Sequence, residues 1–402
     1  FLRKLHAGVL AAAREAAETP PPPSPKGPSI AWTASPTLDH GEWPRLHVLA
    51  DGRYALTYSR VESAAAPYFN YALRFSSDQG RTWSPVQTVF RHFERPLATG
   101  EKTVYMIHNP ELTQLPANHP RHPGRLVATA NLRPAKGPSS IGFSVSDDGG
   151  RTWRQRTVEA GLSKADWPTE PSVVSLGGGR LLAIARAEWC EGTDVRQLPP
   201  LTSSAGGLTW TRAKTVIADV HESTPALLYD GASDELTLYY FHRGPGVLKR
   251  RTAKASAAFA DPLAWSEPEV VACGRKRRAW DSGNVSAVRL DGSDYLAYYA
   301  GDATNATVLV SVVGKAESPV GSWEGRRVLF LGAWDAAQVR ETARRLRFEA
   351  KVYPTADNAF ADYPAEAFWA IVLRDGATDA GARRFSNARI LTESGFKKEI
   401  GQ

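Results

Sequence analysis

Residues Phe143–Trp153 read FSVSDDGGRTW and contain the spacing Ser-x-Asp-x-Gly-x-Thr-Trp. The same spacing occurs at Ser76–Trp83, and a third copy at Ser203–Trp210 has Ala205 in place of the acid. Such a segment predicts a tight hairpin, because Asp and Ser bond nearby backbone amides, Gly accepts a positive φ, and Trp packs against the sheet. Each copy follows an apolar β-type run, which indicates a repeat architecture.

A longer unit recurs around these hairpins. Each unit begins with a polar loop and an apolar run that is usually led by Pro, continues with a second apolar strand, and closes at a tryptophan. The closing residues are Trp83, Trp153, Trp210, Trp265 and Trp323. Their spacing of about 55 to 70 residues accommodates four short strands, which is one blade of a β-propeller. Five units are visible, and a sixth blade could be divided between residues 28–40 and 324–333, so five and six blades both stay open.

The repeated hairpin resembles the Asp box of the sialidase-like superfamily, whose members are β-propellers. The resemblance covers roughly Trp32–Trp323 and implies an all-β, five- or six-bladed propeller of the sialidase-like type. It also implies that the Asp boxes lie on the outer rim, away from the pocket. Because one fold hosts several chemistries, the function has to be argued from the site.

The residue pattern of the sequence changes twice along the chain. Residues 1–27 predict an N-terminal helix and a Pro-rich linker, residues 28–326 the propeller, and residues 327–402 a small α/β domain or domain fragment. The last assignment rests on alternating strand-like and helical segments. This C-terminal segment has no Gly-rich phosphate loop, so no cofactor is predicted.

The composition and the charge pattern argue against several classes of function. A hydrophobic content of 42% and a charged content of 23% are ordinary for a globular protein. The net charge of +7 could attract nucleic acid, but the basic residues are scattered apart from clusters at 275–278 and 340–347, and no nucleic-acid motif accompanies either. No apolar run approaches the ~20 residues of a membrane span. The histidines lack ligand spacing, so no metal site is predicted.

The compartment and the oligomeric state stay open. Cys190 and Cys273 permit one disulfide without requiring it. Glycosylation sequons at Asn284 and Asn305 lean toward a secreted or periplasmic location.

Acidic residues precede the first strand of several units. In a propeller these loops meet at one end of the axis, so the acids could share one concavity. The candidate catalytic residues are Glu170, Asp281, Glu42 and Glu222. Clustered carboxylates suit glycoside cleavage, because one protonates the leaving oxygen while another acts as nucleophile or activates water. Glu170 leads, since its setting resembles the sialidase-like repeat in which a Glu precedes one strand and an Arg ends the next. The alternative is that these acids bond loop amides.

Arginines recur at the end of the second strand, which returns toward the same side. The candidate substrate-binding residues are Arg186, Arg243, Arg133 and Arg60, with Arg45 beside the first blade. Several guanidinium groups aimed at one spot would bind a carboxylate bidentately, which fits the acidic sugars of the family. The alternative is salt bridges to neighbouring blades. In true sialidases the nucleophile is a Tyr activated by a Glu, and the strand tyrosines that could serve are Tyr58, Tyr239, Tyr240, Tyr298 and Tyr299.

One departure from the family pattern bears on which substrate is expected. True sialidases have an Arg before the first-blade Ile-Pro, whereas this chain reads Glu42-Trp43-Pro44. Sialic acid itself is therefore in doubt, while a glycoside site is still favoured. We expect an exo-acting glycoside hydrolase that cleaves a terminal sugar, with acidic sugars included. The alternatives are a non-catalytic propeller that binds glycan or protein, and a propeller-type polysaccharide lyase that uses His242, Arg243 and Tyr239.

Overall fold

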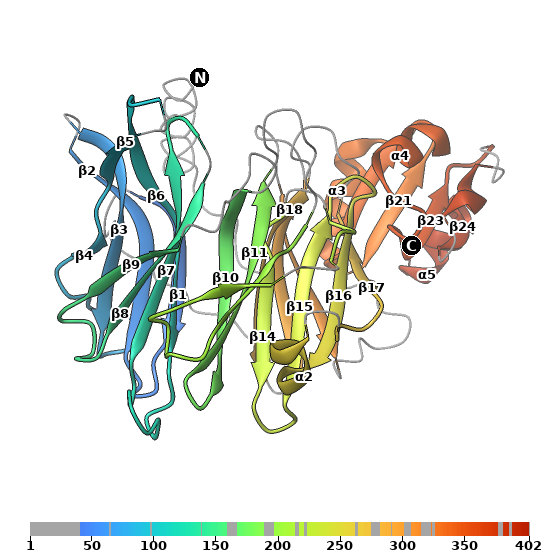
Figure 1. Ribbon diagram of the computed structural model, residues 1–402. Coiled ribbons are helices and arrows are strands. Elements are labelled where there is room, and N and C mark those ends of the chain that lie inside the picture. Colours follow the sequence, from blue (N-terminus) through green and yellow to red (C-terminus); the bar gives the residue numbers. More distant parts are fainter. Residues whose placement is uncertain are drawn as a thin grey trace. The chain divides into compact units, whose positions relative to one another are not determined.

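The computed structural model describes most of the chain beyond residue 40 (Figure 1). The described residues are 41–63, 66–96, 99–137, 139–158, 167–188, 197–213, 217–220, 223–261, 264–274, 282–290, 292–300, 307–314, 323, 326–376, 381–385 and 388–401. The predicted N-terminal helix, the linker and the candidate closing strand at residues 30–33 lie outside them.

Five antiparallel sheets follow one another within the described residues, and each is built from consecutive strands. Blade 1 contains β1 (Gly41–Val48), β2 (Tyr54–Ser63), β3 (Ala66–Ser76) and β4 (Gln87–Phe90). Blade 2 contains β5 (Phe93–Pro96), β6 (Lys102–Gln114), β7 (Leu126–Pro134), β8 (Ser140–Ser146) and β9 (Arg154–Val158). Blade 3 contains β10 (Trp167–Gly177), β11 (Arg180–Glu188), β12 (Pro200–Ser203) and β13 (Thr211–Arg212). Blade 4 contains β14 (Ala226–Asp230), β15 (Glu235–His242), β16 (Val247–Lys254) and β17 (Glu269–Cys273), with α2 (Ala255–Ala260) before β17. Blade 5 contains β18 (Ser282–Leu290), β19 (Ser293–Ala300) and β20 (Thr307–Gly314).

The predicted hairpins connect the last two strands of a blade. In blade 2, Asp148 Oδ1 accepts from the hydroxyl of Ser146 at 2.7 Å and from the amide of Thr152 at 2.9 Å. The indole of Trp153 donates to the carbonyl of Gly150 at 3.1 Å. A Cβ on Gly150 would lie 2.6 Å from the ring of Phe75 in blade 1, so only glycine fits this turn.

Blade 3 retains this turn without its acid. The Ser203 hydroxyl accepts from the amide of Gly207 at 3.1 Å, and Trp210 donates to the Gly207 carbonyl at 3.1 Å. Trp210 also stacks on Phe143 of blade 2 with a centroid distance of 4.0 Å. The Ser203–Trp210 hairpin, which lacks the acid, therefore still packs its tryptophan between two blades.

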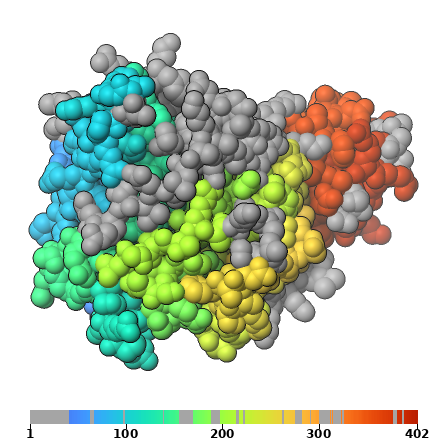
Figure 2. Space-filling view, viewed as in Figure 1, coloured from blue at the N-terminus to red at the C-terminus, as the bar shows by residue number. Residues whose placement is uncertain are grey.

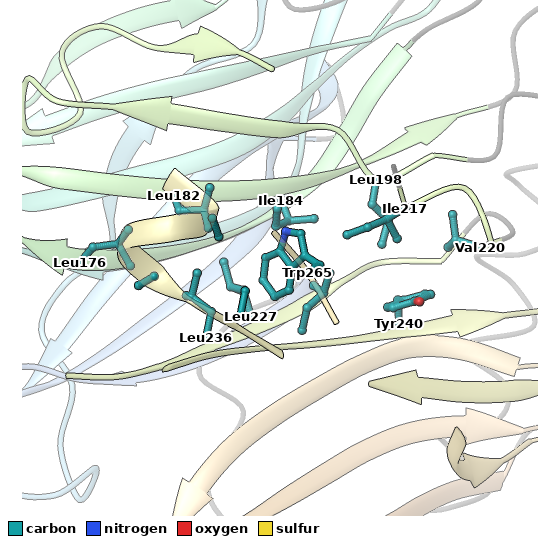
Figure 3. Packing of buried hydrophobic residues seen from close by; sticks show 14 residues of the cluster. Leu176, Leu182, Ile184, Leu198, Ile217, Val220, Leu227, Leu236, Tyr240 and Trp265 are labelled. Atoms are coloured by element: carbon teal, nitrogen blue, oxygen red, sulfur yellow. The ribbon is translucent and has the colours of Figure 1, made fainter. Parts of the chain in front are cut away.

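Apolar side chains fill the spaces between consecutive blades. Figure 3 shows one such layer, in which Leu182 and Ile184 of β11 pack against Leu227, Leu236 and Trp265 of the blade 4 segment. In the space-filling view the surfaces of blades 2, 3 and 4 follow one another (Figure 2). Burying apolar surface on each blade face stabilises the assembly by roughly 25 cal/mol per Å².

The first and last blades each keep an exposed apolar face. Leu46 and Val48 of β1 are 59% and 70% exposed, and Val288 and Leu290 of β18 are 49% and 52% exposed. On β1 these residues alternate with Arg45, which pairs with blade 2. The described part of the chain thus contains five blades, with blades 1 and 5 exposed on these faces.

A parallel sheet of order β22-β21-β23-β24 follows the blades. Its elements are β21 (Arg327–Leu331), α3 (Ala336–Leu346), β22 (Glu349–Tyr353), α4 (Ala356–Asp362), β23 (Ala370–Leu373), the 3-10 helix η1 (Ala382–Arg384), β24 (Arg389–Thr392) and α5 (Glu393–Glu399). This matches the predicted α/β appendage, although α4 and α5 carried too weak an apolar period to be foreseen. Trp323 packs into this unit, 5.2 Å from Trp369 between ring centroids, rather than closing blade 5.

Candidate active site

A bulge recurs in one strand of four blades, namely in β1, β6, β10 and β18. The bulged residues have positive φ angles, namely Trp43 at 53°, Asn109 at 47°, Glu170 at 46° and Asn284 at 50°. At each bulge the register with the second strand shifts. A bulge re-aims a side chain, and left-handed backbone in a non-glycine residue is a strained state that clusters at functional sites. These four residues therefore mark equivalent positions of the repeat.

Glu170 is bound on two sides at this bulge. Its Oε2 accepts from Arg186 Nη1 at 2.9 Å, and the hydroxyl of Thr224 also donates to Oε2. Arg186 comes from β11, where it lies opposite Thr169, and Thr224 precedes the first strand of blade 4. The side chain of Glu170 is only 15% exposed. The carboxylate thus joins two blades.

The electrostatic setting keeps Glu170 ionised. Burial raises the pKa of its carboxyl, but the charge of Arg186, hydrogen bonds from Thr224 and Arg186, and the charge of Arg243 lower the pKa to about 2. An ionised carboxylate at neutral pH accepts a proton or stabilises positive charge, and it is a poor proton donor. Glu170 therefore fits the base or nucleophile side of the expected pair.

A second buried guanidinium lies beside this network. Arg243 follows β15 and is 2% exposed. Its Nε donates to the Ser282 carbonyl at 2.5 Å, and its Nη2 donates to the Tyr299 hydroxyl at 3.1 Å. A Cβ on Gly283 would lie 2.8 Å from Nε, so glycine is needed for the guanidinium to approach the backbone of β18.

The hydroxyl of Thr224 extends the Glu170 network toward blade 5. This hydroxyl also lies 3.0 Å from Oδ1 of Asn284, the bulged residue of blade 5. Polar side chains from blades 3, 4 and 5 thus converge on one network. The bonded residues are Glu170, Arg186, Thr224 and Asn284, and the pair of Arg243 with Tyr299 lies beside them.

Of the other predicted acids, only Glu42 lies among the described residues. Asp281 and Glu222 lie outside the described residues. Glu42 is exposed in β1 and lies opposite Ser59, directly before the bulge of blade 1.

The remaining predicted arginines differ in register from Arg186. Arg186 lies opposite the residue that precedes the bulge, whereas Arg60 pairs with Gly41 and Arg133 with Met106, further from their bulges. Arg133 is exposed. Arg45 Nε lies 3.1 Å from Glu111 Oε1, so it forms the inter-blade salt bridge that was the alternative interpretation.

Two residues of the network were not among the predicted site residues. Thr224 precedes Pro225 as Glu170 precedes Pro171, and Asn284 occupies the bulge position of blade 5. The signal was therefore the position in the repeat. A search limited to acids and arginines could not find them, because a hydroxyl and an amide carry no charge.

Most of the candidate tyrosines bond residues away from the candidate site. Four of the candidate tyrosines bond elsewhere, since Tyr58 accepts from Arg74, Tyr239 donates to Asp294, Tyr240 donates to Asp219, and Tyr298 lies 2.8 Å from Ser311 Oγ. Tyr299 is the candidate that accepts from Arg243, beside the network.

The proposed lyase pair is divided between two faces of one strand. Tyr239 and His242 are three residues apart in β15, so their side chains point to opposite faces. Tyr239 donates to Asp294 in blade 5 at 2.5 Å, whereas His242 Nδ1 lies 3.1 Å from Lys249 Nζ.

The described residues also bear on metal binding and on membrane insertion. Among those residues, His, Cys, Asp and Glu side chains nowhere gather in threes as a metal ion would need. None of the helices in that part of the chain has the length and apolar character required to cross a bilayer.

Comparison with known proteins now defines the class. Residues 31–243 match the model of a family described as BNR repeat-like domain, so the chain belongs to this family. The sialidase-like Asp-box family and the β-propeller, predicted from the repeat, are confirmed, as is the small α/β appendage predicted from the alternating C-terminal segments. No curated protein gives a match.

Three solved structures are similar to this chain. A protein of unknown function from Dyadobacter fermentans has 20% identity and a TM-score of 0.49, with 67% of this chain and 75% of that chain covered. The NanB sialidase from Streptococcus pneumoniae has 12% identity and a TM-score of 0.47, with 75% and 64% covered. The GH43_1 enzyme from Xanthomonas citri complexed with xylotriose has 14% identity and a TM-score of 0.42, with 70% and 88% covered. The chain thus spans less than two thirds of the length of the sialidase.

Proposed function

We propose that this protein is an exo-acting glycoside hydrolase that cleaves a terminal sugar, with acidic sugars as the first candidates. The observation that carries the proposal is that two polar groups from three blades lie beside each other: Glu170 with Arg186, and Arg243 with Tyr299. Such convergence of ionisable groups is typical of an active site rather than of blade packing.

The proposed roles follow from the charge states. Ionised Glu170 accepts a proton, either from the Tyr299 hydroxyl or from a water that attacks the anomeric carbon. The new bond forms at this carbon while the glycosidic C–O bond breaks, and the leaving oxygen takes a proton from a carboxylic acid. Asp281 is the proposed acid, with Glu222 and Glu42 as substitutes. Arg186 and Arg243 supply donors to the sugar, and a carboxylate would gain most from them.

The test uses aryl glycosides of sialic acid, glucuronic acid, arabinose and rhamnose. Wild type should release the aryl alcohol from at least one of them, and Glu170→Gln should lower kcat by about 100-fold or more, because the proton acceptor is lost. Glu269→Gln is the matched control, since Glu269 forms an exposed pair with Arg250 on the outer strands and should leave kcat unchanged. No release by wild type, or full activity in Glu170→Gln, overturns the proposal.

A binding propeller without catalysis is the second candidate. It is favoured by the direct pairing of Glu170 with Arg186, which commits the carboxylate to a structural partner. If calorimetry detects binding of a sugar that wild type never cleaves, this second function replaces the first.

A further inference from the structure

One face of β7 becomes polar toward the candidate site. Val127 on this strand packs with Leu181 of blade 3. Because side chains alternate along a strand, Thr129 and Asn131 lie on the same face as Val127. His108 of β6 lies directly opposite Asn131 in the ladder, one residue before the bulge of blade 2. Thr129 and Asn131 therefore lie on the face of blade 2 toward blade 3, and His108 ends this row where its ring also contacts aromatic residues of blade 1.

Each member of this row has a buried polar atom without a hydrogen-bond partner. The atoms are Thr129 Oγ1, Asn131 Oδ1 and His108 Nε2, in residues that are 1%, 3% and 8% exposed. An unsatisfied buried polar group costs about 1–3 kcal/mol, and most such groups in folded proteins find a partner. Three of them side by side call for a polar occupant.

Aromatic rings adjoin the row. The ring centroid of His108 lies 4.7 Å from that of Trp43 and 5.2 Å from that of Phe69. Trp43 is half-buried and is the bulged residue of blade 1. An aromatic face of this kind is where the apolar side of a sugar ring packs.

The charge state of His108 suits hydroxyl groups. Burial and the charge of Arg133 lower its pKa to about 4, against an opposing effect of the Glu170 carboxylate. The imidazole is therefore neutral at pH 7, with one nitrogen as donor and the other as acceptor.

We propose that His108 and Asn131 form a hydroxyl-binding subsite beside Glu170, with Trp43 as its stacking wall and Thr129 at its base. The subsite takes the hydroxyl-bearing ring of a sugar, and Arg133 lies at its outer end, where it favours an anionic substituent. This inference rests on the proposed function for the identity of the ligand as carbohydrate. A site that hydrogen-bonds a substrate hydroxyl discriminates strongly, because an analogue without the hydroxyl leaves the buried groups unpaired.

The experiment measures binding and stability together. Glucuronic acid, N-acetylneuraminic acid, arabinose and rhamnose are titrated into wild type, Asn131→Leu and His108→Phe, with calorimetry for the dissociation constant and thermal melting for stability. Replacing an unpaired polar group by an apolar one of similar shape should leave the melting temperature unchanged or raise it. Binding of the sugar preferred by wild type should weaken about tenfold or more in both variants. A purely structural role cannot produce this combination.

Ser144→Ala is the matched control, because Ser144 Oγ on β8 is also buried without a partner and belongs to the outer part of blade 2. It should not change binding. Unchanged binding in Asn131→Leu and His108→Phe overturns the subsite, and a lower melting temperature with unchanged binding assigns the row to an internal water instead. Binding without hydrolysis removes the hydrolase and keeps the subsite, whereas no binding of any probe by wild type overturns both.

Discussion

Replacing Glu170 by Gln removes a charge and keeps the shape of the side chain, so its cost can be worked out from the pKa. The folded pKa of about 2 lies below the ordinary value of 4.5. At 1.36 kcal/mol per pKa unit, ionised Glu170 stabilises the folded state by about 3 kcal/mol at neutral pH. The side chain is 15% exposed, so solvent screening takes little from this figure. Glu170→Gln should therefore lower the free energy of unfolding at pH 7 by about 3 kcal/mol.

The sign of the pH dependence follows from the depressed pKa. The contribution of Glu170 is fully present above its unfolded pKa of 4.5 and is lost as the pH falls through its folded pKa of about 2. At pH 3 only about 1 kcal/mol is left. The difference between wild type and Glu170→Gln in urea denaturation should thus shrink from pH 7 to pH 3.

The control is Glu269→Gln, which removes a partner of Arg250 from a carboxylate that is 61% exposed. Exposed pairs contribute about 0–1 kcal/mol, so this variant should be nearly neutral at both pH values. A Glu170→Gln cost below about 0.5 kcal/mol, or a cost that does not change between pH 7 and pH 3, would refute the argument that Arg186 and Thr224 depress this pKa.

Three further outcomes follow from named contacts. Gly283→Ala should push the Arg243 guanidinium away, because the added Cβ would lie 2.8 Å from its Nε. We expect kcat/KM on the best aryl glycoside to fall about 100-fold while the circular dichroism spectrum is retained. Unchanged kinetics would contradict this. Asp147→Ala should lower the free energy of unfolding by about 3 kcal/mol in urea titration. The reason is that it leaves the fully buried Arg125 without the carboxylate that it contacts at 2.5 and 2.8 Å. A neutral result would mean that the remaining partners of Arg125 suffice. Asp148→Ala should lower the melting temperature and leave KM and kcat unchanged, because its four hydrogen bonds hold an outer turn; a loss of activity at full stability would place this turn at the site after all.

Much of the site could be approached from the sequence because the repeat aligns equivalent positions. Glu170 was predicted from its place before a Pro-led strand, and Arg186 from its place at the end of the next strand. The contact between them is local, since one antiparallel register brings the two together across a bulge. Pairing of this kind is readable from alternation and strand order.

Contacts between blades were harder to foresee. The partner of Glu170 in blade 4 is Thr224, 54 residues further along the chain. Arg45 was grouped with the substrate-binding arginines, yet it pairs with Glu111 of blade 2. Whether an arginine faces the axis or a neighbouring blade depends on a shift of one or two residues in register, and the pattern of residue types does not encode this shift.

By itself the sequence determined the repeat, the hairpin chemistry of the Asp boxes and the class of fold, because these depend on residues that are close together along the chain. Only the tertiary structure decided which polar residues share a network, since a contact such as Arg243 with Tyr299 joins two blades over 56 positions. Arg186 and Thr224 then keep Glu170 ionised against the effect of burial, and no local pattern contains that information.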